Sequence, residues 1–188
     1  MELHEAIEKR RTVRVYKKPA TEEQLRKIVL AGSKAPSGGN SQPWEFIIIS
    51  DQNKIDQFAE LKYELNRSNY PPKGGEDLKV MEERARKQKE SFQNAGAVAV
   101  CCQSGQASAG WLAIENMSLA AVADGLGSGI VTYWGKQKDE AQKVLGLPEG
   151  YEIIAILKVG VPVGETVPTP SKRPEFSWLH KDRFGNKG

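Results

Sequence analysis

The chain has 188 residues, of which 39% are hydrophobic and 27% are charged, and its formal net charge is +3. This length and composition suit a single globular domain spanning residues 1–188 and exclude a disordered chain. The mild net charge does not indicate nucleic acid, no apolar run is long enough to span a bilayer, and the first residues lack the order of a secretory signal, so we expect a cytoplasmic protein with no membrane partner.

A short amphipathic helix is predicted over residues 2–10, because apolar residues recur in it at i, i+3 and i+4. It runs into KRRTVRVYKK at residues 9–18, where six of ten residues are basic and none is acidic. A cluster of this kind is either a solvated cationic edge or a site for a phosphate and neighbouring carbonyl groups, which arginine forks and a threonine hydroxyl bind well.

A second helix is predicted to begin at a capping box formed by Thr21 and Gln24. It is expected to reach about Ala31, with Gly32 as its stop. Residues 34–43, KAPSGGNSQP, contain two prolines and two glycines and are expected to form a loop.

Buried strands are predicted where short apolar and β-branched runs are bounded by turn residues. These runs lie at residues 44–50, 96–103, 130–134 and 152–159. The helices expected between them cover residues 51–66, 106–124 and 137–145.

Two stretches are expected to leave the core. Residues 66–92 combine the loop SNYPPKGGE with a charged helical segment that has few apolar residues. This excursion is either a surface helix or a lid over a site. The C-terminal tail, 160–188, is rich in proline and is expected to be extended.

The glycines of GLGSG at residues 125–129 follow a predicted helix and precede a predicted strand, which is the reverse of a dinucleotide fingerprint. They are therefore interpreted as a helix end and a tight turn. The serine of this motif is fourth rather than third, so it does not form a nucleophile elbow. Cys101 and Cys102 are adjacent in an apolar run and should point to opposite faces, as core residues without a disulfide. His4 and His180 are far apart, and no spacing suits a metal site.

Several motifs occur together along nearly the whole chain. They are RRTVR at 10–14, APSGGNSQPW at 35–44, ENMSLAA at 115–121 with GLG at 125–127, and KRP at 172–174. In this order they closely resemble the nitroreductase family of FMN-dependent oxidoreductases. The resemblance implies an α+β fold in which helices flank a central, mostly antiparallel sheet, and an intertwined homodimer with FMN at its interface.

The resemblance also implies which residues bind the cofactor. Arg10, Arg11, Thr12 and Arg14 resemble the residues that hold the FMN phosphate, ribityl chain and pyrimidine edge. Pro36, Ser37, Gly38, Asn40 and Gln42 resemble the loop that approaches the same flavin from the partner subunit. Thr132, Tyr133, Trp134 and Gly135 resemble a turn whose backbone faces the flavin N5 and O4 region, and Lys172 and Arg173 resemble a basic pair at the phosphate.

Such a site needs no catalytic side chain and no metal, because bound FMN carries the chemistry. The implied reaction is ping-pong transfer of hydride from NADH or NADPH through FMN to a small acceptor such as a nitroaromatic or a quinone. Residues 66–92 are the candidate lid, with Tyr70 as a stacking residue for the substrate. Alternatives are specialised flavin chemistry (dehalogenation, flavin cleavage or dehydrogenation), a non-catalytic flavin-binding sensor, and a module that binds nucleic acid through KRRTVRVYKK.

Overall fold

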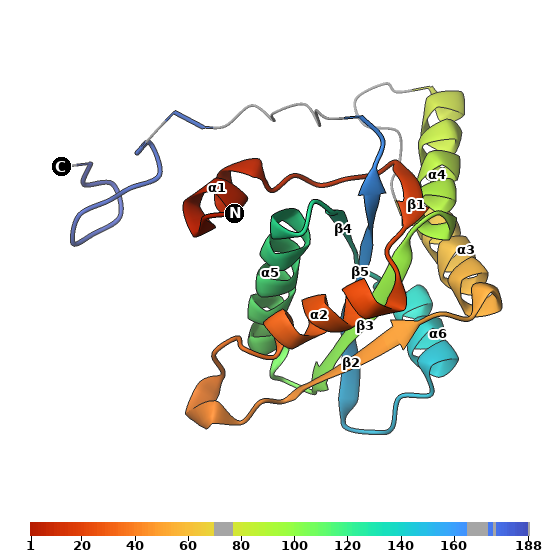
Figure 1. The fold of residues 1–188 in the computed structure, drawn as a ribbon, viewed down its shortest axis with the longest axis horizontal. Helices are drawn as coiled ribbons and strands as arrows, with labels where there is room; N and C mark the ends of the chain where they lie inside the picture. Colours follow the sequence, from red (N-terminus) through yellow and green to blue (C-terminus); the bar gives the residue numbers. More distant parts are fainter. Residues whose placement is uncertain (70–76, 165–172, 175, 188) are drawn as a thin grey trace.

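A computed structural model describes residues 1–69, 77–164, 173, 174 and 176–187, and a five-stranded sheet with helices on both faces forms its centre (Figure 1). The strands are β1 (Tyr16–Pro19), β2 (Trp44–Ile49), β3 (Gly96–Gln103), β4 (Gly127–Val131) and β5 (Tyr151–Pro162). The helices are α1 (Leu3–Lys9), α2 (Glu22–Gly32), α3 (Gln52–Asn69), α4 (Leu78–Gln93), α5 (Ala107–Ala123) and α6 (Gly135–Leu145), with a 3-10 turn, η1 (Gly38–Asn40).

All strand pairs in the sheet are antiparallel. The long strand β5 lies in the middle, with β3 and then β2 on one side. Strands β4 and β1 pair with successive parts of its other edge. Helices and strands therefore combine as the α+β prediction required, and that prediction is confirmed.

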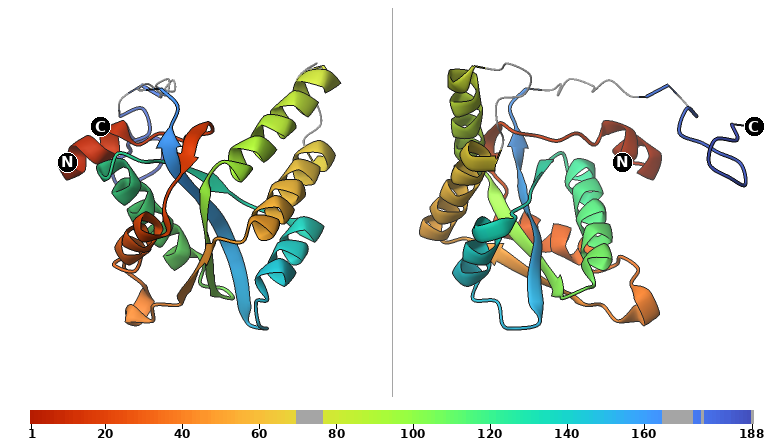
Figure 2. Two further views of the ribbon diagram at one scale, coloured as in Figure 1. Left: turned by 45° about the vertical axis from the view of Figure 1, so that its right-hand side comes forward. Right: turned by 180° about the vertical axis from the view of Figure 1, so that it is seen from behind.

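The helices divide between the two faces of the sheet (Figure 2). Helices α2 and α5 cover one face, with α1 beside α5, and the core beneath them includes Ile28, Ile114 and Met117. Helices α3, α4 and α6 cover the other, with Phe58 and Phe92 in its core. Adjacent strand residues point to opposite faces. Accordingly, the neighbouring cysteines of β3 divide between the two cores, as predicted.

Local sequence signals explain where α2 begins. The backbone N–H of Gln24 donates to Thr21 Oγ1 at 3.3 Å, and Thr21 N–H donates to Gln24 Oε1 at 2.9 Å. This reciprocal pair satisfies two of the N–H groups that a helix start leaves without partners. The predicted capping box is confirmed.

The prediction for residues 125–134 was wrong in detail, because β4 begins at Gly127 and ends at Val131 instead of covering 130–134. The connection from α1 to β1 lies against this strand, and Val13 N–H donates to Ser128 O at 2.8 Å. A Cβ atom on Gly127 would lie 2.5 Å from Val13 Cγ2, and one on Gly129 would lie 2.6 Å from Val13 O. The strand has glycine at these two positions because the Val13 side chain lies directly on Gly127 and the Val13 backbone lies directly on Gly129.

The structure shows how the described part of the predicted excursion packs and where β5 ends. Helix α4 packs along α3, and its Phe92 side chain is 0% exposed in the core, so the charged segment returns to the body of the molecule. Its few apolar residues suffice because Met81 and Ala85 are one turn apart and share a face. At the other end, β5 continues to Pro162 because β1 pairs with it. None of the described helices is long and apolar enough to cross a membrane.

Candidate active site

The basic cluster lies on the connection between α1 and β1, and its arginines have different environments. Arg10 ends α1, and its Nε lies 3.7 Å from Glu115 Oε1 on α5. Arg11 Nη1 donates to the carbonyl oxygens of Glu8 at 2.5 Å and of Arg10 at 2.8 Å. Arg11 therefore satisfies carbonyl groups at the C-terminus of α1, where a positive charge is favoured. Thr12 is exposed and forms an isolated parallel bridge with Ser128.

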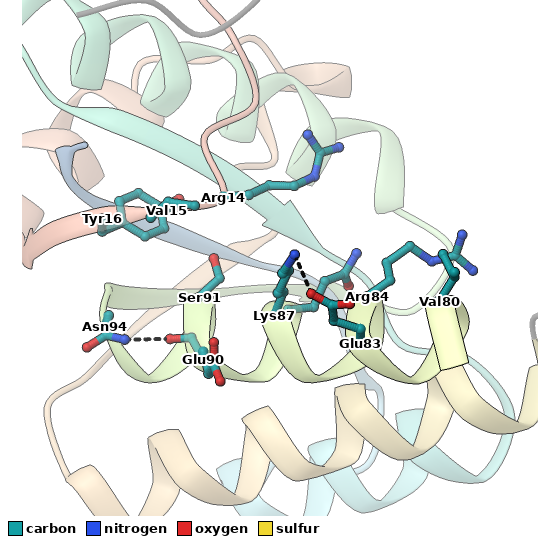
Figure 3. Close-up of a pocket in the computed structure, with 11 residues that line it drawn as sticks. Arg14, Val15, Tyr16, Val80, Glu83, Arg84, Lys87, Glu90, Ser91 and Asn94 are labelled. Carbon is teal, nitrogen blue, oxygen red and sulfur yellow. Dashed lines mark hydrogen bonds and ion pairs between the residues drawn. The ribbon is translucent and has the colours of Figure 1, made fainter. Parts of the chain in front are cut away.

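Arg14 is exposed and has no hydrogen bond or ion pair with any residue in the described ranges. It lines a pocket of about 830 Å³ between residues 14–16 and α4 (Figure 3). This volume falls within the range of small-molecule sites. An unpaired guanidinium at such a pocket provides planar donors for a carboxylate, phosphate or carbonyl oxygen.

The charged side chains of α4 that face this pocket are largely paired along their own helix. Glu83 Oε1 lies 2.7 Å from Lys87 Nζ, and Glu90 Oε1 lies 2.6 Å from Arg86 Nη1. The acidic groups of this wall are therefore offset locally, and Arg14 is left as a cation without a carboxylate partner among the described residues. The pocket is suited to an anionic or carbonyl-bearing ligand.

Tyr16 lines the pocket on the side opposite α4. Its hydroxyl donates to Val13 O at 2.9 Å, and burial raises the pKa of this phenol well above its ordinary value. Tyr16 therefore stays neutral, contributes an aromatic surface and fixes the chain next to Arg14.

A lysine that sequence reasoning missed lies behind this wall. Lys158 is on β5, is 5% exposed, and donates from Nζ to Ser91 Oγ at 2.6 Å. Burial, together with the smaller effect of the nearby cations Arg14 and Lys62, lowers its pKa to about 8. A signal was present in the sequence, since IIAILKVGV at 153–161 contains one charged residue in an otherwise apolar strand.

The turn predicted to face the flavin connects β4 to α6. Lys62, 8% exposed on α3, donates from Nζ to Thr132 O at 3.2 Å and lies 5.0 Å from the centre of the Trp134 ring. Burial lowers the pKa of Lys62 to about 8. Tyr133 points into the core and donates its hydroxyl proton to Phe58 O at 2.8 Å. Gly135 is the first residue of α6, with φ 54°.

The predicted loop lies at the other end of the molecule from the arginines. Gln42 N–H donates to Ser37 Oγ at 3.0 Å, and Ser41 Oγ lies 3.1 Å from Gln106 Oε1 just before α5. Asn40 and Gln42 have positive φ angles, and Pro36 and Gly38 are exposed. In Figure 1 this loop and residues 10–14 lie near opposite ends of α5. A single chain therefore does not bring the two predicted parts of the site together.

The family model named "Nitroreductase family" matches residues 7–161. This chain belongs to the nitroreductase family. It is similar to an iodotyrosine deiodinase of Thermotoga neapolitana, with 28% identity over 85% of this chain and 88% of the relative. It is also similar to an NADH dehydrogenase of Thermus thermophilus, with 29% identity over 86% of this chain and 87% of that protein.

A solved structure has the same fold as this nitroreductase-family chain. It is an oxidised iodotyrosine deiodinase bound to FMN and 3-iodo-L-tyrosine, with a TM-score of 0.76 and 26% identity. The match covers 96% of this chain and all of that one. The family prediction made from the sequence motifs is confirmed.

The remaining predicted site residues belong to the candidate lid at 66–92 and to the C-terminal tail at 160–188. Tyr70 and Lys172 are outside the described residues. Arg173 donates from Nη2 to Ser177 O at 3.3 Å, within its own segment, which Figure 1 draws away from the sheet. The roles of these residues stay predictions. Over the described ranges, no group of three or more His, Cys, Asp or Glu side chains could hold a metal ion.

Proposed function

We propose that this nitroreductase-family chain is an FMN-dependent oxidoreductase that passes hydride from NADH or NADPH to a small acceptor, such as a nitroaromatic or a quinone. The observation that carries the proposal is Arg14, whose guanidinium is exposed, without an ion pair in the described part of the chain, at a pocket of about 830 Å³. The FMN bound by the deiodinase of matching fold supports it.

The residues present fit FMN. The cations of segment 10–14 suit a phosphate and an electron-rich pyrimidine edge. The backbone at Gly38 is open, since a Cβ atom there would have no neighbour within 4 Å in its own chain. When bound, FMN supplies the capacity to accept and donate hydride.

The chain's own residues would orient a ligand in the pocket and place positive charge beside it. Arg14 places a permanent positive charge at the pocket, where it stabilises negative charge that develops on a ligand. Lys62 holds the Thr132 carbonyl and the Trp134 ring, so the turn before α6 is fixed from behind. Helix α4 closes the pocket opposite Arg14, which makes its exposed side chains the determinants of acceptor choice.

A second copy of the chain would complete the site. Apolar side chains are exposed on the three helices of one sheet face: Leu3, Ile7, Leu30, Trp111 and Leu112. In a two-fold dimer that pairs α5 antiparallel with its copy, the loop at one end of α5 meets the arginine segment of the other chain. We therefore include a homodimer with two shared sites in the proposal.

The first experiment is a titration of the purified protein with FMN, followed by flavin fluorescence. Quenching at micromolar protein is expected, and its absence would overturn the proposal. The loaded protein is then mixed with NADH or NADPH without oxygen, and the flavin absorbance should bleach. A panel of nitroaromatic and quinone acceptors should restore it. Binding without bleaching by either nucleotide would favour a flavin sensor.

Mixed dimers test whether the site is shared between chains. Gly38→Val should fold, because the added side chain meets nothing in its own chain, but it should lose FMN binding at the partner's site. Arg14→Ala should weaken binding strongly at the site to which its own chain contributes residue 14. Co-refolding the two variants should recover FMN in the mixed dimers, in one of the two sites. No recovery would show that both halves act within one chain.

Reductive dehalogenation is the second candidate, because relatives of this chain are named iodotyrosine deiodinases. In that reaction two electrons and a proton replace a carbon–iodine bond with carbon–hydrogen and release iodide. Anaerobically reduced protein is mixed with 3-iodo-L-tyrosine, and iodide is measured. Release at a rate above that of nitroaromatic reduction would make dehalogenation the main activity, and no release would exclude it.

A further inference from the structure

The floor of the Arg14 pocket contains a hydroxyl group held by an internal cation. Ser91 lines the pocket from α4, and Figure 3 shows its oxygen pointing toward residues 15 and 16. Behind it, the Lys158 ammonium donates to Ser91 Oγ at 2.6 Å. The same ammonium lies 5.7 Å from the centre of the Tyr16 ring and 5.9 Å from that of Phe92. Lys158 is therefore one side chain removed from the pocket.

The charge on Lys158 has no carboxylate partner among the described residues. The described groups that interact with it are cationic or neutral, and β3 and β4 beside it contain no charged residue. These groups are Arg14 and Tyr16 on the connection and β1, Lys62 on α3, and Ser91 and Phe92 on α4. The nearest acidic side chains of the pocket wall, on α4, are paired with bases of that helix. A buried ammonium without a carboxylate partner in the described ranges leaves positive charge that an anionic ligand would offset.

The hydrogen bond from Lys158 also determines how the Ser91 hydroxyl can bond to a ligand. An ammonium group only donates, so Ser91 Oγ accepts from Lys158 and keeps its own proton for another acceptor. Ser118 on α5 donates its hydroxyl proton back to Ile114 O at 2.8 Å, but Ser91 makes no such bond in the described structure. Its O–H is thus available to an acceptor atom in the pocket.

We propose that Lys158 is a positioning residue of the flavin site, which acts through Ser91 to present a hydrogen-bond donor and a positive charge to the pocket and so favours the reduced, negatively charged flavin over the oxidised one. This inference rests on the proposed function. Transfer of hydride from NADH or NADPH adds two electrons and one proton to the flavin, and the nucleotide leaves as NAD⁺ or NADP⁺. The reduced flavin would carry one more negative charge, which Arg14 in the pocket lining and Lys158 behind Ser91 would offset.

The effect of pH follows from the charge on Lys158. The ammonium form, present below a pH of about 8 in the free protein, supports the anion, and the neutral amine above that pH does not. A bound anion favours the ammonium form, so in the loaded protein the change occurs at a higher pH than in the free protein.

The test compares wild type, Lys158→Met and Ser91→Ala, with Lys18→Met as a control that removes an exposed lysine from β1. Binding of oxidised FMN is measured first. The affinity for reduced relative to oxidised FMN is then obtained from the reduction potential, by equilibration with a reference dye from pH 6.5 to 10. In wild type this ratio should exceed that of Lys158→Met by roughly tenfold at pH 7, and the gap should close at high pH.

The three variants are expected to differ in the ratio of the affinities for reduced and oxidised FMN. Ser91→Ala should lower the ratio less than Lys158→Met and keep the pH dependence, because the charge remains. Lys18→Met should match wild type. If wild type binds FMN but Lys158→Met has the same ratio at every pH, the role of Lys158 is overturned and the proposed function stands. If wild type does not bind FMN, the proposed function fails and this assignment fails with it. Circular dichroism confirms that each variant is folded.

Discussion

The two faces of the sheet are built from the same strands but treat charge differently. The face beneath α2 and α5 is filled with aliphatic side chains such as Ile28, Ile114 and Met117. The face beneath α3 and α4 is also apolar, yet it encloses the ammonium groups of Lys62 and Lys158. A buried cation costs stability, so the fact that the buried cations of the described residues lie on one face marks where the molecule has a use for charge. The following predictions test that difference.

The largest effect is expected from a cavity on the uncharged face. Ile114→Ala should lower the free energy of unfolding by about 2 to 5 kcal/mol, because it removes buried methyl groups and leaves a void. Urea unfolding at a fixed protein concentration measures it. FMN affinity of the folded protein should not change. Lys27→Ala, on the surface of α2, should stay within about 0.5 kcal/mol of wild type and serves as the control.

On the face that encloses the buried lysines, we expect the substitution Lys158→Met to stabilise the protein. The pKa of Lys158 is about 8 in the folded chain and near 10.5 when unfolded, so the unfolded chain holds more protons between these values. Wild-type stability should therefore rise with pH across this window relative to Lys158→Met. Below pH 8 the variant should be more stable, by at most about 3 kcal/mol. Equal pH profiles for the two flavin-free proteins would contradict burial of the charge.

Arg11 and Arg14 are three residues apart, yet we expect their removal to have different effects at the pocket. Arg14→Ala should weaken FMN binding by about 2 kcal/mol, roughly thirtyfold in Kd, because its guanidinium is free to bind the ligand. Arg11→Ala should act mainly on stability, since Arg11 is bonded to carbonyl groups at the end of α1. Fluorescence titration and thermal unfolding of both variants separate the effects. A larger loss of FMN affinity for Arg11→Ala would reverse this assignment.

The smallest effects are expected at two helix caps, one on each face. Thr21 caps α2, and Asp77 caps α4 by accepting from Lys79 N–H at 3.0 Å. Either residue changed to alanine should cost about 1 kcal/mol of unfolding free energy. Only Asp77→Ala should also weaken FMN binding, because α4 forms a wall of the pocket. Equal FMN affinity in both variants would show that α4 contributes nothing to the site.

The elements that sequence reasoning located well have local signals. The strand predicted at 96–103 agrees with β3 residue for residue, and Thr21 caps the start of α2 as predicted. Both features depend on residues that are close together in the sequence. The family was recognised from motifs such as RRTVR. What the sequence could not show is how Arg11 and Arg14 differ. Arg11 follows directly after α1 and reaches its last carbonyls, whereas Arg14 is three residues further along and lies beside α4.

The buried lysines were missed for a related reason. Hydropathy places lysine at the surface, and the groups that accommodate Lys158 come from residues 14–16, α3 and α4, which are distant from it in sequence. The misplaced start of β4 has the same origin. Gly127 and Gly129 have the residue type of a turn, and only the approach of Val13 shows why a strand there must lack side chains.

Those two glycines also decide how this protein can be altered. They contribute no functional group, yet a methyl group at Gly127 would clash with the Val13 side chain and one at Gly129 with the Val13 carbonyl oxygen, next to Arg14. A survey of tolerated substitutions should therefore find positions 127 and 129 among the most restricted in the chain. Efforts to change which ligand binds in the Arg14 pocket should leave them intact and vary the exposed turns of α4.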